Sequence, residues 1–138
     1  MLQSIRKETR VRALLAAPGA GIIGPRGEVE HSPGMSLLLF SSERVTSGAA
    51  LIPHLDTPDA VEHLRGELPS LYRERGTILA VVDPRSMHTD FFSKMAQSFP
   101  ETPVVGAAAG WCTPDQTVTL AADGETGSHG GAYLHLAG

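Results

Sequence analysis

Apolar runs and helical repeats of apolar residues alternate along the chain, and they predict alternating strands and helices. The clearest strand is 77–82 (TILAVV), which is apolar on both faces and is therefore expected at the centre of a sheet covered on two sides. Residues 35–41 (MSLLLFS) form a second apolar run, bounded by Pro-Gly and by polar residues, and also predict a strand. Shorter strands are predicted at 28–30 (EVE) and 103–106 (PVVG), whereas 11–17 (VRALLAA) suits a strand and a helix equally well.

Three segments have the pattern of helices. Residues 2–10 predict a short helix with a charged face. Residues 59–75 repeat apolar side chains at helical spacing, with Thr57 as the expected N-cap and Pro58 in the first turn. A third helix is predicted over 86–99. The side chains expected to form its buried stripe are Phe91, Phe92, Met95 and Phe99.

Near the C-terminus, residues 117–121 and 132–136 alternate polar and apolar side chains. Asp123-Gly124 and Gly127 lie between them, so the pattern predicts a terminal hairpin. Together these elements predict an α/β fold, in which a mixed β-sheet with packed helices is followed by a C-terminal β-hairpin.

Composition narrows the class of protein. At 138 residues and 14.6 kDa, with 41% hydrophobic and 19% charged residues, the chain is expected to form one soluble globular domain over 1–138. Its net charge of −4 conceals a basic N-terminal cluster, which we interpret as the solvated face of a helix. The cluster consists of Arg6, Lys7, Arg10 and Arg12. Because the rest of the chain is acidic, no nucleic acid is expected as a partner.

The sequence also bears on the compartment. No apolar run approaches the roughly 20 residues that span a bilayer, so no membrane partner is expected. Cys112 is the only cysteine, which excludes an intrachain disulfide and favours a reducing compartment. We therefore expect a cytoplasmic location, with an N-terminal organelle-targeting peptide as the minor alternative.

Residues 18–24 (PGAGIIG) contain the G-x-G-x-x-G spacing of dinucleotide-binding proteins, at Gly19, Gly21 and Gly24. That motif works only where a helix begins on the glycines, because the helix N-terminus binds the pyrophosphate. Pro and Gly residues interrupt the following segment, which has no helical period. We therefore expect turn glycines and no nucleotide cofactor.

Enzymatic and metal chemistry have weak support. Cys112 with His129 or His88 would make a thiolate nucleophile and a base, but nothing in the sequence brings them together. The six histidines lack the spacing of metal ligands. We expect no catalytic residue, no bound metal and no cofactor, and we expect Cys112 to be dispensable.

Two acidic pairs have alternative interpretations. Asp83 and Asp90 flank a strand-to-helix connection, where α/β proteins place ligand groups. Capping of the helix by Ser86 is the preferred interpretation of this segment. Glu28 and Glu30 share one face of their strand and either bind a cationic ligand or face the solvent.

Several segments resemble a known family in order and spacing. GAGIIGPRGEVEHSPGMSLLLF is similar to the glycine turn, E-x-E pair and apolar strand of FIST N-terminal domains. DFFSKMAQSFPETPVVGAAAGW resembles the family's helix, strand and small-residue loop, and GETGSHGGAYLHLAG resembles its closing strand. The resemblance extends from about Val11 to the end of the chain. FIST N-terminal domains usually begin with a strand and a helix ahead of the first glycine turn, and a FIST C-terminal domain usually follows them. Here only a short helix precedes the turn and the chain stops at Gly138, so it resembles the later part of such a domain and looks truncated at both ends.

The resemblance implies two functions of different classes. The first is a non-catalytic sensory module that binds a small molecule, such as an amino acid, near the glycine loops at 21–27 and 106–112. Trp111 either stacks on that ligand or anchors its loop to the core. The second is a protein-interaction subunit or adaptor, and a Cys112-dependent enzyme is a distant third. The residues expected to bind the ligand are Gly21, Gly24, Arg26, Glu28, Gly106, Gly110 and Trp111.

The apparent truncation also predicts an oligomer. A missing N-terminal strand would leave an edge of the sheet with unpaired backbone groups, which favours pairing with another chain. We therefore expect a homo-oligomer or a complex with a larger protein.

Overall fold

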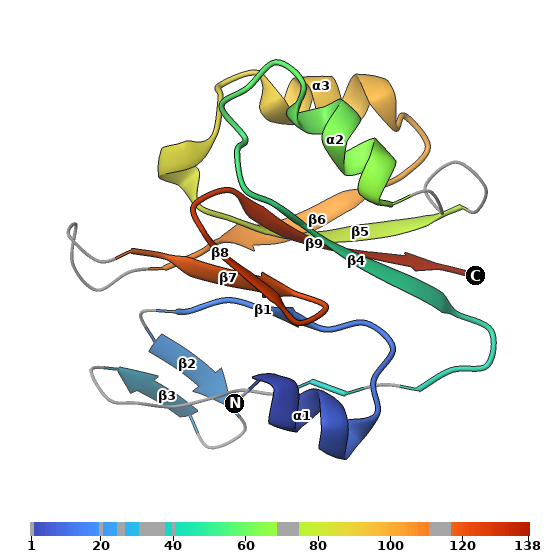
Figure 1. The fold of residues 1–138 in the computed structure, drawn as a ribbon, viewed down its shortest axis with the longest axis vertical. Coiled ribbons are helices and arrows are strands. Elements are labelled where there is room, and N and C mark those ends of the chain that lie inside the picture. Colours follow the sequence, from blue (N-terminus) through green and yellow to red (C-terminus); the bar gives the residue numbers. More distant parts are fainter. Residues whose placement is uncertain are drawn as a thin grey trace.

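The computed structural model describes residues 2–19, 21–24, 27–30, 38–39, 41–68, 75–110 and 117–138. Helices and strands alternate only in the middle of the described chain, whereas strands follow one another directly on either side (Figure 1). In chain order they are α1 (Leu2–Thr9), β1 (Leu15–Ala16), β2 (Gly21–Gly24), β3 (Gly27–Glu30), β4 (Thr46–Ile52), α2 (Ala60–Glu67), β5 (Gly76–Val82), the 3-10 turn η2 (Pro84–Ser86), α3 (Phe91–Ser98), β6 (Val104–Ala108), β7 (Thr119–Ala122), β8 (Glu125–Ser128) and β9 (Gly131–Ala137).

A four-stranded mixed sheet lies at the centre of the molecule, in the order β4-β9-β5-β6. β5 is parallel to β6, whereas β9 is antiparallel to both β4 and β5. Helices α2 and α3 cover one face of this sheet, and the sheet β1-β7-β8 lies against the other (Figure 1). β2 and β3 form a separate antiparallel hairpin. The predicted α/β class with a mixed sheet is confirmed.

Two apolar cores hold these layers together. The larger lies between the helices and the central sheet and includes Leu64, Phe91 and Tyr133. The smaller lies between the two sheets and includes Leu120 and Ala132. β5 contributes alternate side chains to both cores, which confirms its predicted central position. Burying apolar side chains on both faces of this strand stabilises the fold by about 25 cal/mol for each Å² of apolar surface removed from water.

The predicted strand at 35–41 is wrong where the structure describes it. Leu38, Leu39 and Ser41 are not in a strand, and Leu38 is 87% exposed; the other four positions lie outside the described residues. The strand that pairs with the outer side of β9 is instead β4. Its sequence is TSGAALI, and it buries Ala50 and Ile52 on one face. A short apolar run has no period that distinguishes a buried strand from an exposed segment.

Both predicted long helices are shorter than expected. α2 begins at Ala60 after Asp59 and not after Thr57, and of its expected C-terminal part residues 69–74 lie outside the description. α3 spans Phe91–Ser98 only. The expected start at Ser86 is wrong, because Pro84–Ser86 forms a 3-10 turn and Met87 is extended.

The terminal hairpin is confirmed with a different second strand. β7 pairs with β8 through Asp123 and Gly124, whose φ angles of 49° and 91° suit a two-residue type I′ turn. The segment 132–136 lies in β9, which pairs with β4 and β5 in the central sheet. The other strand predictions are confirmed at β3 and β6, as is the helix α1.

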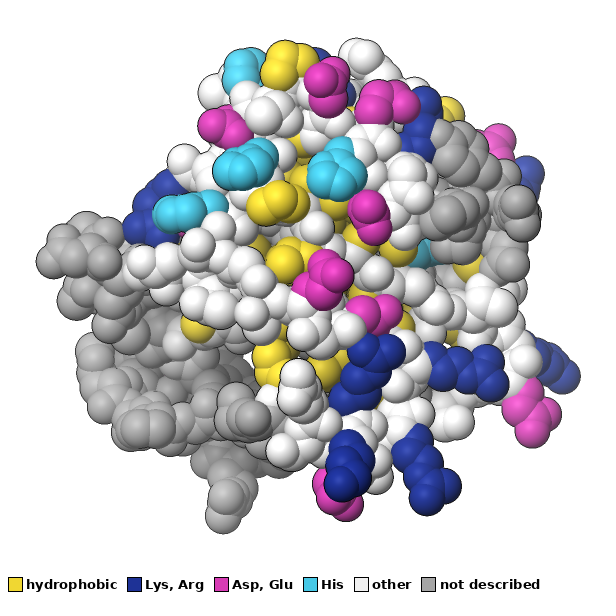
Figure 2. Space-filling view, viewed as in Figure 1, with side chains coloured by type: hydrophobic (Ala, Val, Ile, Leu, Met, Phe, Trp, Pro, Cys, Tyr) yellow, Lys and Arg dark blue, Asp and Glu magenta, His cyan; other side chains and the backbone are white. Residues whose placement is uncertain are grey.

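The basic N-terminal cluster faces the solvent, as expected. Lys7, Arg10 and Arg12 are exposed, and Figure 2 shows Lys and Arg side chains gathered at the end of the molecule where α1 lies. Arg6 is partly buried and donates a hydrogen bond to the backbone oxygen of Asp123, which ties α1 to the β7–β8 turn. No helix in the described part of the chain is long and apolar enough to cross a membrane.

Candidate functional site

The strongest candidate for a site lies at the carboxyl ends of β5 and β6. Two parallel strands end there side by side, and Ala109 N donates to Val82 O at 2.7 Å. Asp83 follows β5 directly, and its side chain is fully buried. Ligands commonly bind at this position in α/β proteins. A buried carboxylate here is stable only if other groups compensate its charge.

The carboxylate of Asp83 accepts hydrogen bonds on both oxygens. Oδ1 accepts from Arg85 N at 3.0 Å and from Arg85 Nε at 3.1 Å. Oδ2 lies 3.2 Å from Arg85 Nη2 and 3.2 Å from His129 Nδ1. Burial alone raises the pKa of Asp83, but the bonds from Arg85 and His129 outweigh it and hold the pKa below its ordinary value. Asp83 is therefore a charged anchor for two basic side chains.

The connection between β8 and β9 supplies the rest of the site. His129 and Gly130 have φ angles of 72° and 83°, both left-handed. Gly130 O accepts from Asp83 N at 2.8 Å. Ser86 Oγ accepts from Gly130 N at 2.6 Å and donates to Asp83 O at 3.0 Å. Non-glycine residues adopt positive φ at a cost, and these bonds hold His129 in that conformation.

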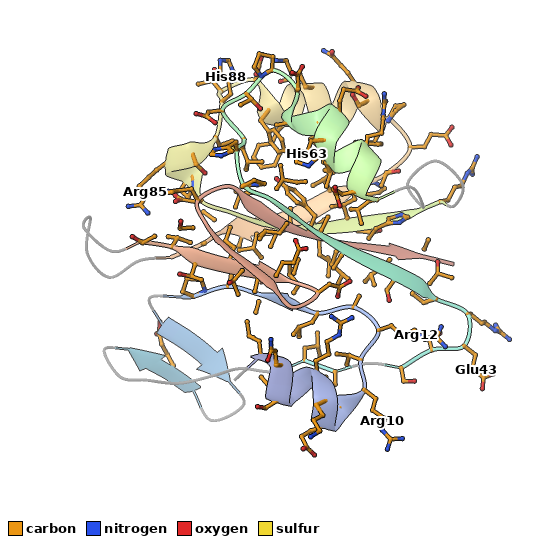
Figure 3. All side chains as sticks on the ribbon, in the orientation of Figure 1. Arg10, Arg12, Glu43, His63, Arg85 and His88 are labelled. Atoms are coloured by element: carbon orange, nitrogen blue, oxygen red, sulfur yellow. The ribbon has the colours of Figure 1, made fainter. Side chains whose placement is uncertain are left out.

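Two side chains of this cluster reach the solvent. The side chain of His129 is 53% exposed and that of Arg85 33%, and Figure 3 shows Arg85 pointing outward from η2. When His129 donates through Nδ1 to Asp83, its Nε2 accepts a hydrogen bond, or donates one if the ring is protonated. The cluster therefore presents a guanidinium and an imidazole, both oriented by one buried carboxylate.

A second polar network lies on the surface at the start of α3. Asp90 bonds His88 through Oδ1 and Lys94 through Oδ2, the latter at 3.1 Å. The bond from Lys94 is the main cause that lowers the pKa of Asp90. Asp90 precedes α3 but makes no capping bond through its side chain. Its carboxylate faces the solvent, unlike that of Asp83, and we interpret the network as a solvent-exposed group of ion pairs.

Comparison with known proteins identifies the family. The family model of the FIST N domain matches residues 1–138. The chain belongs to the FIST N domain family. Members of this family are generally sensory domains of signal transduction. No curated protein and no solved structure matches the chain.

The FIST N domain separates the two glycine loops that were predicted to share a ligand. Gly21 and Gly24 lie in β2 and Glu28 in β3, whereas Gly106 and Gly110 lie in and directly after β6. The β2–β3 hairpin and β6 are in different sheets, with β1-β7-β8 between them (Figure 1). The other two predicted ligand residues, Arg26 and Trp111, lie outside the described residues. A ligand site formed by these residues therefore stays a prediction.

The packing explains Gly106 without a ligand. A Cβ atom at this position would lie 1.8 Å from the backbone oxygen of Ala80 on the neighbouring strand β5. No side chain fits there unless the strands move apart.

The preferred interpretation of 83–86 as a cap is confirmed in part. The capping side chain is that of Asp83, not Ser86, since Asp83 accepts from Arg85 N. Sequence reasoning did not find Arg85 and His129 as partners of Asp83. The Arg two residues after the Asp is a local signal, but His129 is 46 positions away. Cys112, which the sequence suggested as a partner of His129, lies outside the described residues. Within the described residues no group of three or more metal-ligating side chains occurs.

The glycine segment of this FIST N domain is not expected to bind nucleotides. β2 pairs with β3 as an antiparallel hairpin, so its backbone groups belong to a sheet and not to the start of a helix. Titration with NAD, FAD and ATP, followed by calorimetry, should give no saturable signal. Micromolar binding that disappears in Gly21→Val would contradict this prediction.

Proposed function

We propose that this FIST N domain is a non-catalytic sensory module that binds a small carboxylate ligand, such as an amino acid, at the Asp83 cluster. The observation that carries the proposal is the buried carboxylate of Asp83, which orients Arg85 and His129 while both keep solvent exposure. A guanidinium whose orientation is already fixed binds a carboxylate with little further loss of side-chain entropy. The family's sensory role makes a small molecule the appropriate class of ligand.

The bonding of the cluster supports binding and not catalysis. An Asp–His pair orients the general base of many hydrolases, but it needs a nucleophile within reach of the imidazole. The nearest hydroxyl of the cluster, Ser86 Oγ, donates to Asp83 O and accepts from Gly130 N. A hydroxyl bonded in this way stabilises the loop and is not positioned for attack on a substrate.

The proposal predicts carboxylate-dependent binding. The twenty L-amino acids would be titrated by calorimetry, and each one that binds would be compared with its carboxamide, which lacks the charge. We expect at least one amino acid to bind and its carboxamide to bind much more weakly. Replacing Arg85 by Ala should weaken binding about tenfold or more, because a hydrogen bond to a charged group contributes about 1.5–3 kcal/mol. His129→Ala should weaken it in the same direction.

Arg75→Ala is the matched control, since Arg75 is a largely exposed arginine paired with Glu101 at 3.4 Å, outside the cluster. The Arg75→Ala variant should bind the amino acid with the same affinity as the unaltered protein. Equal losses in Arg85→Ala and Arg75→Ala, or no binding of any amino acid, would contradict the proposal. Binding that survives Arg85→Ala and is lost in Trp111→Ala would place the ligand at the predicted glycine loop instead.

A further inference from the structure

β6 is an uncovered edge of the central sheet. In the described part of the chain its one neighbour in the sheet is β5. Residues 105–108 are all exposed, and Val105 is 49% exposed. β4, the opposite edge, buries Ala50 and Ile52 and contacts β7 and α2. Among the described residues β4 and β6 each have one neighbour in the sheet, but β6 is the more exposed of the two edges.

The hydrogen bonds to β5 determine which backbone groups of β6 point outward. Ile78 N donates to Pro103 O at the start of the strand, and Ala109 N donates to Val82 O at its end. In a parallel ladder with this register, alternate residues bond to the neighbour. The N–H and C=O groups of Val104, Gly106 and Ala108 consequently face away from β5, toward the free edge.

We propose that this edge pairs with β6 of a second copy of the chain, antiparallel and centred on Gly106. A two-fold interface requires a surface that is complementary to itself. The outward-facing residues are spaced evenly about Gly106, so a second copy places Gly106 opposite Gly106 and Val104 opposite Ala108. Each outward N–H then meets an outward C=O of the partner strand. Val105 lies opposite Ala107 in the same register, so each larger side chain faces a smaller one.

Charge favours a second copy over an unrelated polar partner. Protected edge strands carry Lys, Pro or inward charges, whereas β6 (VVGAA) carries neither a charge nor a proline. α3, which covers this end of the sheet, has a single charged residue, Lys94, and it is already paired with Asp90 at 3.1 Å. Although the chain has a net charge of −4, β6 itself therefore brings no charge to the paired edge.

The area that a stable dimer needs brings α3 into the interface. Standard interfaces bury about 800 Å² on each partner, which is more than the edge of a five-residue strand provides. An apolar groove of about 390 Å³ lies beside β6, lined in part by Phe92, Met95, Phe99 and Val104, and the side chain of Phe92 is 46% exposed. The two-fold axis of paired antiparallel strands is perpendicular to the sheet, so both α3 helices and both grooves lie on the same face of the extended sheet, beside the paired strands.

The test is sedimentation equilibrium over a concentration series. We expect a monomer–dimer equilibrium, and we expect Val105→Lys to raise its dissociation constant about tenfold or more, because two lysines would enter the paired edge. Leu38→Lys introduces the same charge at a residue that is 87% exposed, and it should leave the constant unchanged. A monomer at every concentration, or equal effects of the two lysines, would overturn the proposal.

Disulfide cross-linking tests the register, in a Cys112→Ser background. Val105 and Ala107 form a non-hydrogen-bonded pair in this register, with Cα atoms about 4.5 Å apart, a separation that a disulfide can bridge. A mixture of Val105→Cys and Ala107→Cys chains should therefore oxidise to a covalent heterodimer, whereas either chain alone should cross-link poorly. Equal cross-linking of all three samples would exclude the centre at Gly106.

Discussion

Replacing Gly130 by Ala is expected to lower the free energy of unfolding by about 4 kcal/mol, a large part of the 5–15 kcal/mol typical of a domain. Gly130 has φ 83°, where a Cβ atom costs about 1–2 kcal/mol. That atom would also lie 2.0 Å from Ile52 O and 2.7 Å from Pro53 C, both backbone atoms that cannot rotate away. Moving Gly130 breaks its bonds to Asp83 N and Ser86 Oγ, each of which stabilises by about 1 kcal/mol.

Three further Gly→Ala variants separate the two causes. Gly27 has φ 111° but nothing within 4 Å of a Cβ atom, so only backbone strain of about 1–2 kcal/mol is expected. The φ angle of Gly106 lies outside the left-handed region, but a Cβ atom there would contact Ala80 O severely, so its alanine variant tests the contact alone. Gly66 lies in α2 with open space around it, and Ala should stabilise that helix by about 0.5–1 kcal/mol.

Urea unfolding of the four variants, followed by circular dichroism, measures these differences. The expected order of stability runs from Gly66→Ala through Gly27→Ala to the variants of Gly106 and Gly130. A Gly130→Ala variant that is as stable as Gly27→Ala would show that the β8–β9 connection relaxes freely, and the conformation inferred for His129 would then be wrong.

The sequence predicted those elements whose signal is local. β5 was recognisable because its apolar residues belong to two cores, and the β7–β8 turn because Asp123-Gly124 suits positive φ. The Pro and Gly residues that follow PGAGIIG correctly excluded a helix over β2 and β3, which form a hairpin. In each case the side chains of one short segment determine the backbone conformation.

Other elements depend on contacts that are distant in the sequence. β9 alternates polar and apolar residues like one strand of a hairpin. Its neighbours in the sheet are nevertheless β4 and β5, whose paired residues lie more than 40 positions earlier in the sequence. Leu38 is exposed although it lies in a continuous apolar run, whereas Ile52 is buried at the end of TSGAALI, so burial could not be predicted from hydrophobicity alone. Only part of the candidate site could be predicted. Asp83 could be recognised because it follows a clear strand, whereas His129 is distant in the sequence and only the fold brings it beside Asp83.

Asp83→Asn is expected to lower the free energy of unfolding by about 3 kcal/mol at pH 7, because breaking a buried charge pair leaves its partners uncompensated. The amide would turn N–H donors toward Arg85, which is itself only a donor, and would weaken the bond to His129 Nδ1. Since Arg85 and His129 both lose their anchor, the proposed carboxylate binding should be lost as well. Arg85→Ala should lose the ligand with a smaller loss of stability, because its side chain is one-third exposed.

The pH dependence of this variant has a definite sign. The pKa of Asp83 in the folded protein lies below its ordinary value of 3.8, so its ionised form stabilises the fold. That contribution is fully present above pH 3.8 and is lost as the pH falls through the folded pKa. The difference in stability between the unaltered protein and Asp83→Asn should therefore be constant from about pH 7 to about pH 5 and shrink below about pH 4.

Asp90→Asn is the matched control, because the pKa of Asp90 is also lowered but its carboxylate faces the solvent. Exposed ion pairs contribute little to stability, so this variant should unfold at nearly the same urea concentration as the unaltered protein at pH 7 and should keep its ligand affinity. Equal stabilities of the two variants, or a difference for Asp83→Asn that does not shrink in acid, would show that Asp83 is not the charged anchor of Arg85 and His129. The ligand proposal would then lose the observation on which it depends.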